Sequence, residues 1–583
     1  MKQQRPTRRR NVKLEPPPAW RARAVLIGFA VFGVVLAGRA FDLQVVEHEF
    51  LAQEGEKRHL RTVEVPAVRG AIRDRNGEPL ALSAPTESVW AVPSALLEAP
   101  EKLGPLARVL DMKTDDLRER LRAHASRQFL YLRRQLSPAE GRMVMAVEAP
   151  GVFLQREYKR YYPAGEAAAQ LVGLTNIDGA GQEGLELALQ ARLDGQPGSR
   201  RVIKDRLGRV VDDIAEFAPP RAGQDIRLTV DLRLQYAAYR ELKAAVERNR
   251  ASSGMVVMVE PSSGDVLAMA SYPSFNPNNR DALDPSGLRH RAVTDTFEPG
   301  STIKPLIMAR ALDEGRIGPG SVIDTEGGVW RVSRDLTVRD FRDYGDVDLK
   351  RLLTKSSNVG AAKIGLELGP ESVWQTYLDF GFGAETASGF PGERTGVLRD
   401  FYNWGRVETA TAAYGYGVAV TGLQLAGAYA ALANDGLAQS LKLVREQTQV
   451  LGSEPRQVVT PQAARTVRQK MSGVVSNEGT ASRAALPGYS VAGKTGTVRK
   501  VGGSGYNRER HQSLFVGMTP LDNPRVVTVV VIDEPRGKDY YGGAVAAPVF
   551  ARVMRDALRV MKVRPDQGGT LTADAAAADG ERS

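Results

Sequence analysis

An uninterrupted apolar segment near the N-terminus constrains this chain most, because it decides where the rest of the chain can fold. Residues 24–38 (AVLIGFAVFGVVLAG) contain no polar side chain. As a helix they would span roughly 22 Å, short of the ~30 Å hydrocarbon core. Residues 24–45 are long enough if Arg39 extends to the outer interface, so we predict a transmembrane helix there. The alternative is a cleaved signal peptide, although no A-x-A cleavage site follows.

Basic residues in front of this segment indicate its orientation. The chain has a net charge of +11, and residues 1–23 contribute +7 of it. Such a distribution describes a basic tail and not a nucleic-acid-binding face, so we expect no nucleic-acid partner. By the positive-inside rule, residues 1–23 lie in the cytoplasm and residues after about 46 lie across the membrane. Cytosolic cofactors such as ATP are absent there, and the chain has no G-x-x-x-x-G-K-[ST] motif.

Several kinds of catalytic chemistry are excluded by composition. The chain has no cysteine, which rules out disulfides, thiolate metal sites and cysteine nucleophiles. Its 5 histidines form no HxH or HExxH pair, so we expect no metal site. No G-x-S-x-G elbow accompanies them.

The 583 residues are too many for one ordinary domain, and the composition changes near residue 222. We predict an α+β domain over 46–222 and an α/β domain with a sheet over 223–563. Residues 564–583, rich in Ala, Asp and Gly, are predicted to be disordered. The glycine-rich, charged stretch 499–512 is predicted to be a mobile loop.

The first chemical motif is Ser301-Thr302-Ile303-Lys304, an S-x-x-K that follows a helix-start sequence, Glu298-Pro299-Gly300. Positions i and i+3 share one helix face, which places Lys304 beside the Ser301 hydroxyl. A serine needs a base to become a nucleophile. Lysine can be that base if burial and a neighbouring cation lower its pKa from about 10.4 towards 7. Alone the motif is weak, because roughly one S-x-x-K is expected by chance in a chain of this length.

A second motif, Ser356-Ser357-Asn358, precedes a predicted helix. By itself it is only a helix N-cap sequence. Together with the first motif, Ser356 could relay a proton to a leaving amine, and Asn358 could hydrogen-bond Lys304 and a substrate carbonyl.

The third motif is Lys494-Thr495-Gly496-Thr497, within a strand-like segment. Glycine in a strand suggests close approach of a ligand to the backbone. Lys494 would supply the second cation, and the hydroxyls of Thr495 and Thr497 would bind a carboxylate. The backbone N–H groups of Thr497 and Ser301 would form an oxyanion hole. Without the other motifs, K-T-G is equally an edge strand with a polar turn.

In this order the three motifs resemble the penicillin-recognising serine enzymes. Longer segments resemble the class B penicillin-binding proteins, and among them the division-specific, FtsI-type enzymes. The segments that carry the resemblance are residues 69–81, Arg156, Gly184, Glu186, and residues 273–278, 297–305, 414–417, 421–429, 434–436, 478–480 and 541–550. The resemblance covers roughly residues 20–560.

The resemblance implies a penicillin-binding transpeptidase fold, a five-stranded antiparallel sheet flanked by helices, on an elongated pedestal at residues 46–222. It implies a D,D-transpeptidase of the inner membrane, with its catalytic domain in the periplasm at the division septum. Ser301 would attack stem peptides that end in D-Ala-D-Ala, and β-lactams would acylate it. No cofactor would be needed. Glycan polymerisation would come from an FtsW-type glycosyltransferase among the divisome proteins.

Three alternatives stay open at this point. The first is the elongation-specific class B enzyme, whose motifs are similar. The second is hydrolysis of the acyl-enzyme, as in a carboxypeptidase or β-lactamase. The third is a non-catalytic sensor or scaffold that only binds β-lactams or divisome proteins.

Overall fold

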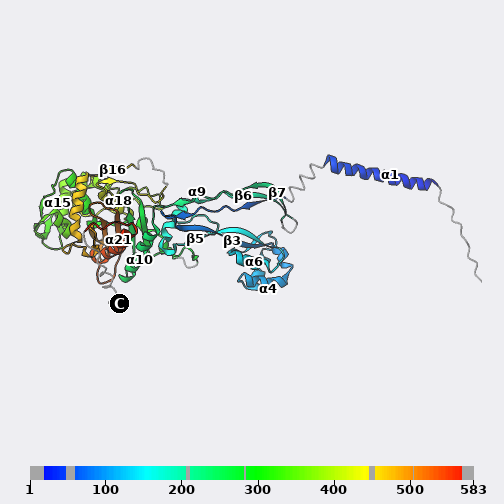
Figure 1. Cartoon of the computed structure of the whole chain (residues 1–583), viewed down its shortest axis with the longest axis horizontal. Coiled ribbons are helices and arrows are strands. Elements are labelled where there is room, and N and C mark those ends of the chain that lie inside the picture. Colours follow the sequence, from blue (N-terminus) through cyan, green and yellow to red (C-terminus); the bar gives the residue numbers. More distant parts are fainter. Residues whose placement is uncertain are drawn as a thin grey trace, which may run out of the picture.

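The computed structural model contains an N-terminal helix, an elongated pedestal and a C-terminal unit (Figure 1). We use "pedestal" for residues 60–227 and "C-terminal unit" for residues 232–567. Most of the predicted basic tail and nearly all of the predicted disordered tail lie outside the described residues. The structure describes residues 19–47, 60–204, 210–280, 284–445, 454–502 and 505–567.

The apolar segment forms the helix α1 (Ala19–Phe41), which continues as a short π-helix, η1 (Asp42–Val46). In the part of the chain that the structure describes, residues 23–46 are the one helical stretch long and apolar enough to cross a membrane. Arg39 lies in its last turn and pairs with Asp42, so the predicted interfacial arginine has a polar partner.

Two sheets build the pedestal, and their long strands extend away from the C-terminal unit (Figure 1). The first sheet has the order β1-β6-β7, all antiparallel, and includes the predicted strand near residue 61. The second has the order β4-β3-β2-β8, with β5 also pairing β3. Strand β8 follows residue 222 and still pairs with β2, in parallel. The strands are β1 (Leu60–Val65), β2 (Ile72–Arg73), β3 (Pro79–Ala91), β4 (Leu130–Leu136), β5 (Val152–Tyr161), β6 (Gly198–Lys204), β7 (Val210–Ala218) and β8 (Ile226–Arg227).

Short helices pack on these strands around a small core of their own. That core contains leucines from the helices, such as Leu103 and Leu117, and Val89 from β3. Ser137 begins α6 with a capping box that it shares with Glu140. The pedestal helices are α3 (Pro93–Leu97), α4 (Pro100–Val109), α5 (Thr114–Ala123), α6 (Pro138–Met145), η2 (Gly165–Ala167), α7 (Ala169–Val172), α8 (Gly184–Ala188) and α9 (Gln190–Leu193).

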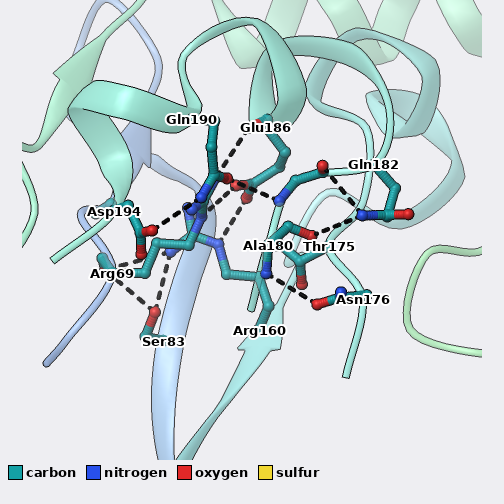
Figure 2. A network of polar contacts seen from close by, with 12 residues as sticks. Arg69, Ser83, Arg160, Thr175, Asn176, Ala180, Gln182, Glu186, Gln190 and Asp194 are labelled. Carbon is teal, nitrogen blue, oxygen red and sulfur yellow. Dashed lines mark hydrogen bonds and ion pairs between the residues drawn. The ribbon is translucent and has the colours of Figure 1, made fainter. Parts of the chain in front are cut away.

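A buried carboxylate holds the base of the pedestal together (Figure 2). Glu186 is 0 % exposed and accepts hydrogen bonds from Arg69 Nε at 2.7 Å and Arg160 Nε at 2.6 Å. Arg160 also donates to the Ser83 hydroxyl at 3.1 Å. These contacts join β3, β5 and α8 to the segment before β2. The arginine that contacts Glu186 is Arg160, whereas Arg156 is exposed.

The C-terminal unit is built on a five-stranded sheet of order β10-β9-β19-β18-β17, antiparallel throughout, as predicted. Every residue of β9 is buried, so both faces of the sheet are covered, and its nearly continuous apolar sequence follows from that. Strands β9 and β10 follow one another in the chain and form an antiparallel hairpin. The strands are β9 (Ser253–Val259), β10 (Val266–Tyr272), β17 (Ala492–Gly502), β18 (Gly505–Thr519) and β19 (Val526–Asp533).

Helices cover this sheet and carry the site. Helix α10 (Leu232–Arg248) lies beside α21 (Ala547–Val560) against the sheet. Helix α18 (Gly422–Ala433) is almost wholly buried and contacts β9 and β19. The other helices of the unit are α11 (Pro285–Leu288), α12 (Arg291–Thr294), η4 (Gly300–Ile303), α13 (Lys304–Asp313), η5 (Glu326–Gly328), α14 (Leu349–Lys355), α15 (Asn358–Leu368), α16 (Pro370–Asp379), η6 (Phe401–Asn403), α17 (Arg406–Ala412), α19 (Pro461–Met471), η7 (Ser472–Val475), η8 (Ser482–Ala484) and α20 (Gly542–Val545).

Three two-stranded ribbons complete the unit. They pair β11 with β14, β12 with β13, and β15 with β16. Their bounds are β11 (Val322–Asp324), β12 (Val329–Arg331), β13 (Thr337–Arg339), β14 (Asp346–Asp348), β15 (Leu437–Ala438) and β16 (Arg456–Gln457).

The predicted mobile loop at 499–512 is wrong. The described residues of this stretch extend β17 and β18, with Arg499 opposite His511 and Val501 opposite Tyr506. Its charges are used in ion pairs: Lys500 Nζ and Arg510 Nε donate to Glu534 Oε1 at 2.8 and 2.9 Å. The polar composition of this stretch therefore does not indicate a solvated loop. The stretch forms a hairpin whose charged side chains bind Glu534, at the end of β19.

Removing the charge of Glu186 should destabilise the pedestal. The variant Glu186→Gln leaves two buried guanidinium groups without a counter-charge, which typically costs about 3–5 kcal/mol. Hydrogen exchange of the β3 and β5 amides in the full chain measures this loss. The matched control is Asp115→Asn, which breaks an exposed pair with Arg118 and should change exchange by at most about 1 kcal/mol. Equal protection in the two variants would contradict the role given to Glu186.

Candidate active site

Ser301 lies in a tight turn that leads directly into a helix, as the helix-start sequence predicted. Residues 300–303 form the 3₁₀ turn η4, and α13 begins at Lys304. Gly300 has a φ of +52°, and a Cβ there would lie 2.5 Å from Val498 Cγ2 on β17. Glycine is required at this position because the turn packs directly on the strand. Ser301 is half-buried, and within the described ranges its hydroxyl has no hydrogen-bond partner.

Lys304 is buried to 1 % exposure and points at the second motif. Its Nζ donates to the Ser356 carbonyl oxygen and to Asn358 Oδ1, both at 2.7 Å, and lies 3.3 Å from Ser356 Oγ. The predicted hydrogen bond between Lys304 and Asn358 is therefore present. All three acceptors are neutral oxygens, so no carboxylate in direct contact with Lys304 favours its charged form.

Ser356 occupies the junction between α14 and α15 in a left-handed conformation, with φ +60° and ψ 43°. Left-handed backbone is uncommon for a residue other than glycine and is often found at functional sites. Here it ends α14 and turns both the carbonyl and the hydroxyl of Ser356 towards the lysines. Ser357 then caps α15 by accepting from Gly360 N at 2.9 Å.

Asp340 fixes this junction from outside the motif, and the sequence patterns did not identify it. Its Oδ2 accepts from the Ser357 hydroxyl at 2.6 Å. Its Oδ1 accepts from the backbone N–H groups of Asn358 and Val359, at 2.5 and 3.1 Å. Because Asp340 follows β13 and lies far from Ser356 in sequence, no fixed spacing connects the two.

Lys494 lies on β17, an edge strand of the five-stranded sheet, and is 0 % exposed. Its Nζ donates to Ser356 Oγ at 2.9 Å and to the Thr495 carbonyl at 3.1 Å. The hydroxyl of Ser356 thus lies within hydrogen-bond distance of both buried lysine amines. Among the predicted residues, the structure brings Lys304, Ser356, Asn358 and Lys494 into one hydrogen-bonded group, with Ser301 on the turn beside it.

Burial lowers the pKa of both amines. Desolvation brings the pKa of Lys304 down to about 7, while the negative charge of Asp340 acts in the opposite direction. Desolvation lowers the pKa of Lys494 well below its ordinary value, and the charge of Lys304 lowers it further. At neutral pH a large fraction of Lys304 is consequently uncharged and able to take a proton. The main cause for Lys304 is burial rather than the neighbouring cation.

The threonines of the third motif line the same strand. Thr497 Oγ1 accepts from Gly542 N at 3.0 Å, so its own hydrogen is free to donate to a ligand. Thr495 Oγ1 lies 2.8 Å from Thr480 Oγ1. A Cβ on Gly496 would lie within 3.4 Å of Thr302 and of the Pro299 carbonyl, so the turn that carries Ser301 approaches the strand closely at this glycine. The close approach of a ligand to this glycine stays a prediction.

A carboxylate and an aromatic group form one wall next to the Ser301 turn. Glu298 Oε1 accepts from Gly417 N at 2.8 Å and from the Tyr506 hydroxyl at 2.9 Å. Burial raises the pKa of Glu298. Tyr506 packs edge-on against Tyr416, with ring centroids 5.7 Å apart. The hairpin of β17 and β18 is thereby attached to the loop that carries Ser301. No group of three or more His, Cys, Asp or Glu side chains in the described ranges could hold a metal ion.

Both parts of the chain match families of known proteins. Residues 254–555 match the model of the penicillin-binding protein transpeptidase domain, and residues 64–228 match that of the penicillin-binding protein dimerisation domain. The chain therefore belongs to the penicillin-binding proteins, in the class that joins these two domains, class B.

Relatives resemble the chain over nearly its whole length. It is 42 % identical over 538 residues to the Pseudomonas aeruginosa protein named "Probable peptidoglycan D,D-transpeptidase PbpC", covering 92 % of this chain and 94 % of that one. It is 39 % identical over 554 residues to "Peptidoglycan D,D-transpeptidase FtsI" of Escherichia coli K12, covering 94 % and 93 %.

Solved structures of similar proteins also align with the chain. The transpeptidase domain of Burkholderia pseudomallei penicillin-binding protein 3 aligns with a TM-score of 0.53 at 38 % identity, over 58 % of this chain and 98 % of that one. A peptidoglycan synthetase from Bifidobacterium adolescentis aligns with a TM-score of 0.70 at 25 % identity, over 88 % and 98 %.

The rate of acylation by penicillin should depend on pH through Lys304. A base accepts a proton only in its neutral form, so with Lys304 as the predicted base the rate should fall as pH decreases through about 7 and level off above it. Stopped-flow acylation with a fluorescent penicillin between pH 5 and 9 measures this profile. A rate that is still rising at pH 9 would show that Lys304 retains an ordinary pKa.

Neutralising Asp340 should move that profile and slow the reaction. In Asp340→Asn the negative charge that favours protonated Lys304 is gone, so the pKa of Lys304 should fall. The pH at which the acylation rate drops should then move to a lower value. The loosened Ser356–Asn358 junction should also reduce the maximal rate roughly tenfold to a hundredfold. Asp346→Asn, an exposed acid on β14, is the matched control and should leave both unchanged. A slower rate with an unchanged pH dependence would show that Asp340 has a purely structural role.

Proposed function

We propose that this chain is a serine D,D-transpeptidase that cross-links the stem peptides of peptidoglycan during cell division. The observation that carries the proposal is the buried, partly neutral Lys304, hydrogen-bonded to Ser356 and Asn358 and one helical turn from the half-buried Ser301. Transpeptidases among its relatives, including the E. coli protein named FtsI, support the chemistry and the division role.

The reaction follows from the roles that we assign to the side chains. Ser301 Oγ attacks the carbonyl of the penultimate D-Ala while Lys304 takes its proton. The N–H groups of Ser301 and Thr497 stabilise the oxyanion, and the hydroxyls of Thr495 and Thr497 bind the terminal carboxylate. Collapse of the intermediate breaks the peptide bond, and Ser356 passes a proton to the departing D-Ala amine. Asn358 orients the donor peptide, and Lys494 holds the Ser356 hydroxyl in place.

The acyl-enzyme is then attacked by the amine of a neighbouring stem, which restores Ser301 and forms the cross-link. An extended donor peptide can lie along β17, because the outer backbone groups of an edge strand are available for pairing. β-Lactams would acylate Ser301 in place of the donor.

The same proposal covers location and partners. Residues 24–45 would anchor the chain in the inner membrane, with residues 1–23 in the cytoplasm. The domains predicted over residues 46–222 and 223–563 would lie in the periplasm at the septum. An FtsW-type glycosyltransferase and other divisome proteins would supply glycan strands and recruit the enzyme.

Loss of the Ser301 hydroxyl should abolish both labelling and cross-linking. Ser301→Ala should show no covalent fluorescent penicillin on a denaturing gel and no cross-linked product from a glycan strand with pentapeptide stems. Ser126→Ala, an exposed pedestal serine, is the control and should match wild type in both assays. Covalent labelling of Ser301→Ala would remove Ser301 as nucleophile. Labelling of wild type without any cross-linking would favour the sensor or hydrolase alternatives. Localisation of a fluorescently tagged chain in cells tests the division role, because an even distribution along the side wall would favour the elongation-specific enzyme.

A further inference from the structure

A cavity lies in the C-terminal unit, and the proposed catalytic residues do not line it. It has a volume of about 370 Å³ and lies between the C-terminal end of α10, residues 537–539, η8 and the start of α21. Helices α10 and α21 lie side by side (Figure 1), so the floor of the cavity is rigid. A volume of this size is in the range of pockets that bind small ligands.

The cavity is strongly basic. Four cationic side chains line it, Arg248, Arg483, Lys538 and Arg552, against one acid, Asp539. Within the part of the chain that the structure describes, only Arg552 has an ion-pair partner, because its Nε donates to Glu241 Oε2 at 2.5 Å.

The arrangement also leaves hydrogen-bond donors unused. Arg552 Nη2 is buried and has no hydrogen-bond partner among the described residues. Arg483 is exposed, and its one hydrogen bond among the described residues is a long bond of 3.4 Å to the Ala544 carbonyl. Buried donors without a partner are costly, and clustered cations repel one another, so both costs fall when an anion enters. Charge-assisted bonds from guanidinium groups suit a carboxylate especially well.

The cavity is joined to the active site by one short element. Helix α20 (Gly542–Val545) lines the cavity with Ala544 and Val545, and at its other end Gly542 N donates to Thr497 Oγ1 at 3.0 Å. Loop residues 537–539 continue into Tyr540, whose carbonyl accepts from Ser513 on β18 at 2.6 Å. A ligand in the cavity would therefore contact the segment that supports the third motif.

We propose that this basic cavity binds the carboxylates of a peptidoglycan stem peptide, as a second peptide site behind the acyl-transfer site. The proposal rests on the transpeptidase function proposed above, because such stems bear free carboxylates and are present wherever the enzyme acts. A stem held there would keep a cell-wall strand close to Ser301 while successive cross-links form.

The test uses the full chain in detergent, first acylated at Ser301 with unlabelled penicillin so that the primary site is blocked. A fluorescent stem tetrapeptide with free carboxylates is titrated, and anisotropy is measured. We expect saturable binding that weakens with salt, no binding of the fully amidated tetrapeptide, and binding about tenfold weaker in the double variant Arg483→Glu/Lys538→Glu. The control double variant Arg127→Glu/Arg142→Glu, which makes the same charge change on the exposed pedestal surface, should bind like wild type.

Several results would overturn the proposal. Equal binding of the amidated peptide would remove the carboxylates as the recognised groups, and unchanged binding in Arg483→Glu/Lys538→Glu would remove this cavity as the site. Displacement of the tetrapeptide by an equal concentration of inorganic phosphate would show a general anion site. Penicillin labelling separates this proposal from the proposed function: normal labelling of Ser301 without tetrapeptide binding defeats only the second site.

Discussion

Two buried lysine amines share the hydroxyl of Ser356, and the rest of the active site is arranged around that contact. Burying two amines without a carboxylate in direct contact is unfavourable when both are charged. The protein meets this cost by lowering their pKa values and by supplying neutral acceptors, namely the Ser356 carbonyl and hydroxyl, Asn358 Oδ1 and the Thr495 carbonyl. The same burial that disfavours the charged state makes Lys304 a base near neutral pH.

Several distant elements must cooperate to keep that contact. Ser356 needs a left-handed backbone, which is held by the end of α14 and by the capping of α15. Asp340 bonds the first turn of α15 and also limits how far the pKa of Lys304 falls. Lys494 is positioned by the register of β17 against β18, where it lies opposite Val516. A change in any of these elements is transmitted to the Ser356 hydroxyl.

Much of this arrangement was predictable from sequence, because the chemistry depends on short local patterns. The three motifs predicted which side chains would meet, and the sequence also predicted a sheet in the C-terminal domain. Asp340 was not predictable, since a capping contact from a separate ribbon has no fixed spacing. The hairpin at 499–512 was missed because its charged residues pair with Glu534, a partner that composition does not reveal. Lys304 Nζ does not hydrogen-bond the Ser301 hydroxyl in this structure, although the two residues are one turn apart. Catalytic hydrogen bonds often tighten only once substrate binds.

The pedestal also buries charged groups and must compensate for the cost of burying them. Glu186 is buried between Arg69 and Arg160, so opposite charges in direct contact compensate for its burial. Among the described residues no carboxylate contacts Lys304 in this way, and burial therefore lowers the pKa of Lys304.

The titration of the Lys304 side chain tests this account most directly. In protein labelled with ¹³C at lysine Cε, the Lys304 signal can be assigned by its loss in Lys304→Arg and followed with pH. The account predicts a midpoint close to the value of about 7 that burial imposes. A midpoint near the ordinary value of 10.5 would contradict it, because a permanently charged Lys304 could not accept the proton of Ser301.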